Sequence, residues 1–207
     1  MSTPVLAMAV RPTNRIPARI YDACLIAGFS LVIAVSAQVS IPLPFTPVPV
    51  TLQTFAVVLT GALLGSRRGA AAVLLYLAEG FAGLPVFSLG SAGFVHLLGP
   101  TGGYLIGFAF AAWITGFLIE RRLATTLLGA LMVLILGHLV PYIPGVAWLS
   151  VSLGPSRAFA LGFLPFLVGD ALKIVASVGV LTGANILVRS KDLHDTLRRV
   201  DGRNEAE

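Results

Sequence analysis

The chain has 207 residues, of which 57% are hydrophobic and only 11% are charged, and its mean hydropathy is +0.92. Soluble globular chains carry far more charge, so this composition excludes a water-soluble domain and predicts a polytopic membrane protein. A net charge of +5 would favour a nucleic-acid partner in a soluble protein, but here the positions of the charges matter more than their sum.

Six stretches are apolar enough to be membrane-spanning helices, which need about 20 apolar residues each. The second and third stretches are short, the last is long, and residues 142–164 form an outer connection before it. The sequence therefore predicts an all-α integral membrane protein with six transmembrane helices. The six stretches are residues 20–39, 51–65, 69–84, 104–119, 125–141 and 165–188.

The basic residues predict how the chain crosses the membrane. If the N-terminus is cytoplasmic, twelve of the fourteen lie in cytoplasmic segments, while Arg157 lies in an outer connection and Lys173 in a span. Because Lys and Arg concentrate on the cytoplasmic side, we expect both termini to be cytoplasmic, and the charge no longer indicates nucleic acid. The chain then divides into a cytoplasmic segment (1–19), a six-helix transmembrane domain (20–188) and a charged cytoplasmic tail (189–207).

The two longest Pro- and Gly-rich connections lie on the outer side. Residues 42–49, here called the proline arch, contain four prolines and no charge, which favours a stiff, extended backbone. The arch is equally compatible with a plain connector and with a lid over a ligand. Residues 85–101 are Gly-rich and uncharged apart from the titratable His96, and such backbone fits a cavity lining. The candidate lid residues are Phe45, Pro47 and Pro49.

Three ionisable residues lie inside predicted spans, where charge is costly and therefore indicates function: Glu79, Asp170 and Lys173. Asp170 and Lys173 are three positions apart on one helix face, so they can also simply neutralise each other. At a rise of 1.5 Å per residue, they lie about 8 Å and about 12 Å into the last helix. Other polar groups also fall in the outer half of the spans, namely Gln53, Tyr104 and His138.

This distribution predicts a water-accessible cup that opens outward above an apolar inner half, since a channel would need polar groups at both depths. Asp170 offers acceptors for N–H donors, and Lys173 can hold a carboxylate or fix Asp170. The predicted ligand is a small and partly apolar solute. Apolar walls would come from Phe45, Phe87, Tyr104 and Phe166.

Catalytic motifs are missing from the sequence. No Gly-Lys dipeptide occurs, so the glycine-rich residues 99–103 are not a Walker A loop, and the chain is not expected to hydrolyse ATP by itself. Neither Gly-x-Ser-x-Gly nor His-Glu-x-x-His occurs, and the histidines lack the spacing of metal ligands. We therefore expect no enzyme activity, no catalytic residue, no cofactor and no metal.

Small residues recur along the first predicted helix and allow another helix to approach closely. The stripe is compatible both with docking of another membrane subunit and with packing inside the chain. It consists of Ala23, Ala27, Ser30, Ala34 and Ala37.

Four segments, in this order, resemble the BioY family, the biotin-specific substrate-capture subunits (S components) of energy-coupling factor transporters. The resemblance covers about residues 20–188, and one departure is that Leu89 and His96 stand in a loop where the family has mainly small residues. The segments are Pro47–Thr54, Gly83–Phe87, Gly99–Leu105 and the set Pro165, Phe166, Gly169, Asp170 and Lys173.

The resemblance implies a six-helix protein of a prokaryotic cytoplasmic membrane. Such proteins bind biotin from outside and release it inward when they are coupled to a transmembrane T subunit and two ATPase subunits, which alone use ATP. The partner-docking surface implied by the first helix includes Ala23, Ala27 and Ala34.

The resemblance also implies roles at the site. Asp170 would accept the ureido N–H groups, Lys173 would position Asp170 or meet the carboxylate, and Tyr104 with Phe87 would contact the bicyclic ring. Two alternatives stay open: a transporter working without ATPase subunits, with Glu79 as coupling carboxylate, and a membrane protein without a ligand. The full set of expected substrate-binding residues is Asp170, Lys173, Tyr104, Gln53, Phe87, Glu79, Gly102 and Gly103.

Overall fold

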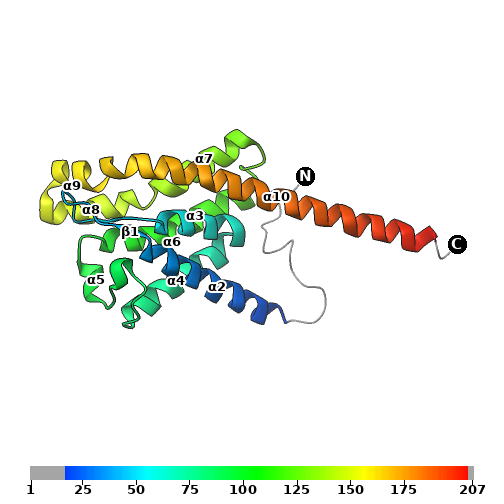
Figure 1. Cartoon of the computed structure of the whole chain (residues 1–207), viewed down its shortest axis with the longest axis horizontal. Helices are drawn as coiled ribbons and strands as arrows, with labels where there is room; N and C mark the ends of the chain where they lie inside the picture. The colour runs from blue at the N-terminus through cyan, green and yellow to red at the C-terminus, as the bar shows by residue number, and fades with distance from the viewer. Residues whose placement is uncertain (1–16, 205–207) are drawn as a thin grey trace.

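A computed structural model of the chain describes residues 17–204 and is mostly helical (Figure 1). Most of the predicted N-terminal segment, including Arg11 and Arg15, lies outside the described residues. The helices are α2 (Ala18–Gln38), α3 (Gln53–Leu64), α4 (Ser66–Phe81), α5 (Val95–Leu98), α6 (Gly102–Glu120), α7 (Leu127–Leu139), α8 (Tyr142–Leu153), α9 (Pro155–Gly162) and α10 (Leu167–Asn204), with 3-10 turns η1 (Ser88–Gly90) and η2 (Leu164–Phe166).

Four helical segments of the described part are long and apolar enough to cross a membrane: 18–38, 102–120, 127–153 and 155–184. This agrees with a membrane protein. Helix α3 has only 12 residues, or about 18 Å, which is shorter than a bilayer core of about 30 Å. The count of six spans and the cytoplasmic position of both termini therefore stay predictions.

Residues 142–164, interpreted as an outer loop, are largely helical and form α8 and α9, while their position on the outer side stays a prediction. Proline is tolerated at the start of a helix, where its missing N–H is not needed. Pro141 stands at the N-cap of α8, and Pro155 begins α9 directly after Gly154, whose φ of 79° ends α8. Pro141 and Pro155 thus mark helix starts, and Arg157 lies within α9.

Helix α6 forms the centre of the bundle and packs against α3, α4, α7 and α8. Helices α2 and α10 lie on opposite sides of it, and the C-terminal part of α10 projects beyond the bundle (Figure 1). A Cβ atom at Gly61 would collide with the backbone carbonyl of Ala112, so glycine there allows α3 and α6 to approach closely. This contact holds the last turn of α3 against α6.

The proline arch leaves and re-enters the bundle through a short antiparallel pair, β1 (Ser40–Ile41) and β2 (Val50–Thr51). At its tip, the hydroxyl of Thr46 donates a hydrogen bond of 2.7 Å to the carbonyl of Leu161 in α9. The arch is thus fixed at its base by the strand pair and at its tip by α9.

Candidate functional site

A cavity lies at the end of the bundle where the arch, α5, α8 and the start of α10 come together. Its empty space, counted out to the mouth and including open solvent, is about 560 Å³, and about 50 Å³ of this is enclosed. The lining comes from segments far apart in the sequence: Val48, Pro49, Thr51, Gln53, Thr54, Ser88, His96, Thr101, Tyr104, Leu105, Phe108, Pro141, Tyr142, Phe166, Asp170 and Lys173.

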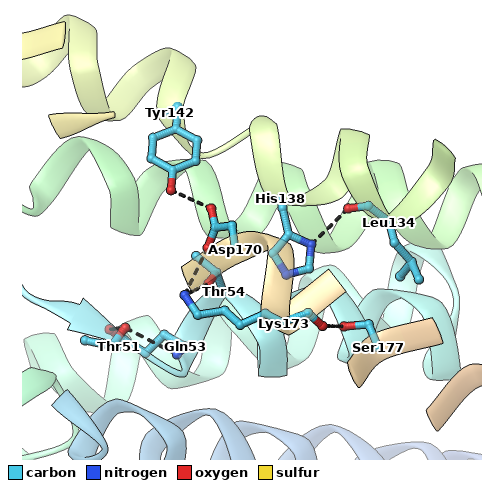
Figure 2. A network of polar contacts seen from close by, with 9 residues as sticks. All are labelled: Thr51, Gln53, Thr54, Leu134, His138, Tyr142, Asp170, Lys173 and Ser177. Atoms are coloured by element: carbon cyan, nitrogen blue, oxygen red, sulfur yellow. Dashed lines mark hydrogen bonds and ion pairs between the residues drawn. The ribbon is translucent and has the colours of Figure 1, made fainter. Parts of the chain in front are cut away.

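Asp170 and Lys173 form a buried ion pair at the start of α10. The Nζ of Lys173 lies 3.0 Å from Oδ1 of Asp170, and the two side chains are 9% and 7% exposed. Lys173 also donates to the Thr54 hydroxyl at 2.8 Å, and the Tyr142 hydroxyl donates to Oδ2 of Asp170 at 2.5 Å (Figure 2). Because an unpaired buried charge is costly, these contacts fix the pair between α3 and α8.

The pair keeps unused hydrogen-bonding capacity. A carboxylate can accept about four hydrogen bonds and an ammonium can donate three. The described contacts of the Asp170 carboxylate and the Lys173 ammonium leave acceptor sites on the first and one donor on the second. A pair with no net charge, offering both acceptors and a donor, suits a neutral ligand group that carries N–H and C=O together, such as a urea or an amide.

Gln53 lines the cavity, and hydrogen bonds at both its amide nitrogen and its amide oxygen fix its orientation. Its Nε2 donates to the hydroxyl of Tyr76 at 2.6 Å, while its Oε1 accepts from the hydroxyl of Thr51 at 3.0 Å. The side chain is buried at the first turn of α3. The predicted position of Gln53 beside the cavity therefore agrees with the structure.

Aromatic and aliphatic side chains form the walls of the cavity. Tyr104 donates its hydroxyl proton to the carbonyl of Gly162 at 2.7 Å and packs edge-to-face on Tyr142, with 6.0 Å between the ring centroids. The ring of Tyr104 is thus fixed by both ends, which leaves it as an apolar surface toward the cavity. The remaining wall residues are Val48, Leu105, Phe108 and Phe166.

Phe87 and Glu79 do not line this cavity. The Phe87 ring is fully buried, edge-on to the ring of Tyr76 at 5.5 Å between centroids. The Glu79 carboxylate accepts a hydrogen bond of 2.7 Å from the Ser30 hydroxyl, so it joins α4 to α2. Both residues lie in the packing behind the site.

Gly102 and Gly103 are likewise absent from the lining and lie in the first turn of α6. A Cβ atom at Gly102 would collide with the carbonyl of Leu97, and one at Gly103 with the carbonyl of Pro144. These glycines allow α5 and α8 to approach α6, and so they shape the cavity indirectly.

Of the three expected lid residues of the arch, only Pro49 lines the cavity. Phe45 is 58% exposed and Pro47 is exposed, whereas Val48 and Pro49 line the cavity.

The small-residue stripe of α2 is divided by the fold. Ala23 and Ala27 are exposed, while Ala34 is only 6% exposed and packs in the main core cluster. Only the first part of the stripe is therefore open to a partner.

Sequence reasoning did not single out Thr54 or Tyr142. Thr54 ends a segment already used for the resemblance, so its adjacency to Gln53 was an available signal. Tyr142 was missed because its segment was interpreted as a loop.

His138 was predicted to lie near the site but was given no role. Its Nδ1 lies 2.9 Å from the carbonyl of Leu134, and its Nε2 is buried without a partner among the described residues.

The model of the BioY family matches residues 8–190 of the sequence. This chain belongs to the BioY family. It is 40% identical to a probable biotin transporter BioY of Pyrococcus horikoshii over 158 residues, covering 76% of this chain and 91% of the relative. It is 38% identical to the biotin transporter BioY of Rhizobium etli over 177 residues, covering 81% and 93%.

A solved structure of the family supports the fold. The crystal structure of the S-component for biotin from an ECF-type ABC transporter matches with a TM-score of 0.72 and 28% identity, over 81% of this chain and 93% of that chain. The similarity extends over nearly the whole of the solved chain, so the cavity described above lies within a shared S-component architecture.

Proposed function

We propose that this chain captures biotin with high affinity as the substrate-binding subunit of an ECF-type, ATP-driven importer. The observation that carries the proposal is the buried Asp170–Lys173 pair, held by Thr54 and Tyr142 at the wall of the cavity. Membership of the BioY family supports it, since the relatives are named biotin transporters.

Biotin fits the chemistry of the cavity. Its bicyclic ring carries a ureido group with two N–H donors and one carbonyl, which matches the neutral pair of Asp170 and Lys173. In the proposed complex, Asp170 accepts the ureido N–H groups while Lys173 holds the Asp170 carboxylate in position. Tyr104 contacts the bicyclic ring, and the arch closes the cavity through Val48 and Pro49.

The proposal includes a place in the cell. The chain would cross the cytoplasmic membrane of a prokaryote six times with both termini inside, and it would bind a transmembrane T subunit and ATPase subunits. The exposed Ala23 and Ala27 of α2 are the proposed start of that docking surface. The partners would consume the ATP, and the chain itself would need no cofactor.

Isothermal titration calorimetry of the purified chain in detergent, without ATP or partners, tests the capture step. We expect saturable biotin binding that Asp170→Asn weakens by about 2 to 5 kcal/mol, because one member of a buried charged pair is lost. Unchanged affinity in Asp170→Asn would contradict the proposed anchor.

Uptake into vesicles separates the importer from a transporter that works alone. The importer requires the partner subunits and ATP for biotin accumulation. Accumulation by this chain alone in ATP-free vesicles, abolished in Glu79→Gln, would favour the autonomous alternative instead.

A further inference from the structure

The cavity has a second group of polar residues, from η1, α5 and the N-cap of α6. They are Ser88, His96 and Thr101, whereas Asp170 and Lys173 come from α10. Figure 1 shows α5 and the start of α10 on opposite sides of α6, so the two polar groups come from helices on either side of it. The rest of the lining is largely apolar, including Leu105 and Phe108, with Thr51, Gln53 and Thr54 as its further polar members.

The ring of His96 is fixed in its place. Its Nε2 lies 3.1 Å from the hydroxyl oxygen of Thr101, and the ring stacks on Phe87 with 5.1 Å between centroids and 18° between planes. Phe87 is itself fully buried and packs edge-to-face on Phe81. A ring held on one face and at one nitrogen is already oriented before a ligand arrives, which lowers the entropic cost of binding.

His96 is also the titratable residue of this second group. Its two contacts, Phe87 and Thr101, do not titrate near neutral pH. The other titratable groups that line the cavity are Tyr104 from α6, Tyr142 from α8, and Asp170 with Lys173 from α10. Burial lowers the pKa of His96 below its ordinary value, so the ring of the empty site is uncharged at pH 7.

A ligand that contacts both groups of polar residues has two polar groups of its own and an apolar remainder. Biotin has this form, with a ureido group, a sulfur-containing ring with an aliphatic chain, and a carboxylate. If the ureido group binds Asp170, the carboxylate reaches toward the wall that carries His96.

We propose that His96 binds the carboxylate of the ligand and takes up one proton from water as it does so. The protonated ring then donates from both nitrogens, one to the Thr101 hydroxyl and the other to the carboxylate. This inference rests on the proposed function.

Calorimetry with biotin and with biotin methyl ester, from about pH 6 to about pH 8.5, tests the inference. The ester keeps the ureido end, so the difference between the two ligands reports the carboxylate alone. We expect biotin to bind about tenfold more tightly than the ester near pH 6, with proton uptake seen in buffers of different ionisation enthalpy. The preference falls as pH rises, because His96 must then be protonated at a growing cost.

His96→Gln is expected to bind the ester as the unchanged chain does, while its biotin affinity falls to the level of the ester at every pH. His194→Gln, on the part of α10 beyond the family match, is the matched control and keeps the preference. A preference for biotin that persists in His96→Gln, or that is independent of pH in the unchanged chain, would overturn the inference.

If His96→Gln does not fold, the pH dependence of the unchanged chain still tests the inference. Thr101→Val is a second variant, in which the preference for biotin over its methyl ester should be weaker. The two proposals fail differently. Absence of saturable biotin binding by the unchanged chain overturns the proposed function and this inference together, whereas tight biotin binding without ester discrimination overturns only the inference.

Discussion

The ammonium of Lys173 and the hydroxyl of Thr54 lie 2.8 Å apart, although 119 positions separate them in the sequence. This contact joins α10 to α3 at the ion pair and uses one of the three donors of the ammonium. The position of the charged group therefore depends on how two distant helices pack, as well as on the neighbouring Asp170.

Thr54→Val tests this contact. The variant keeps the shape of the side chain and removes the acceptor, so the ammonium loses a hydrogen bond worth about 1.5 kcal/mol and biotin affinity should fall roughly tenfold. Binding calorimetry measures the change. Thr60→Val is the control, because the buried Thr60 hydroxyl bonds only to Ala56 of its own helix. Equal affinities for the two variants would contradict the role of Thr54.

The charged pair should contribute to binding more than to stability. Asp170→Leu or Lys173→Met alone leaves one buried charge unpaired and should destabilise the fold by about 3 to 5 kcal/mol. The double variant removes both charges, so its melting temperature in detergent should recover toward that of the unchanged chain, while biotin binding stays absent. A double variant that melts as early as the single variants would show that the pair is needed for folding.

The arch should control how quickly the ligand leaves. Thr46→Val removes the hydrogen bond to the carbonyl of Leu161, which is worth about 1 kcal/mol, so biotin should dissociate about fivefold faster. A chase of bound labelled biotin with unlabelled biotin measures the rate. Thr46→Ser keeps the hydroxyl and should release biotin slowly, whereas release from Thr46→Ser as fast as from Thr46→Val would show that the hydrogen bond to Leu161 does not set the rate.

A change in the packing behind the site should alter ligand binding by moving the Phe87 ring. A Cβ atom at Gly80 would collide with the Phe87 ring, so Gly80→Ala must displace the ring on which His96 stacks. We expect a loss of stability of about 1 to 3 kcal/mol and weaker biotin binding, measured by melting and calorimetry. Gly179→Ala, where no atom lies within 4 Å of the added Cβ, is the control and should leave both unchanged. A Gly80→Ala variant that is less stable but binds biotin with full affinity would show that the position of the Phe87 ring does not affect binding.

Composition and local spacing determined the class of this protein. Apolar runs and the distribution of basic residues predict a helical membrane protein, because the cost of placing charge in hydrocarbon acts on each residue separately. The contact between Asp170 and Lys173 was predictable for the same kind of reason, since residues three positions apart share one helix face. The order of four short segments then indicated the family.

Only the tertiary structure decided which side chains line the cavity. Phe87 and Glu79 looked like site residues by type and depth, but helix packing turns them toward Tyr76 and Ser30. Tyr142 reaches Asp170 from the start of α8, a helix that the sequence analysis had treated as a connection. How each helix is rotated about its axis, and which distant residues it meets, depend on the faces of the neighbouring helices. A segment read by itself does not show which neighbour it packs against.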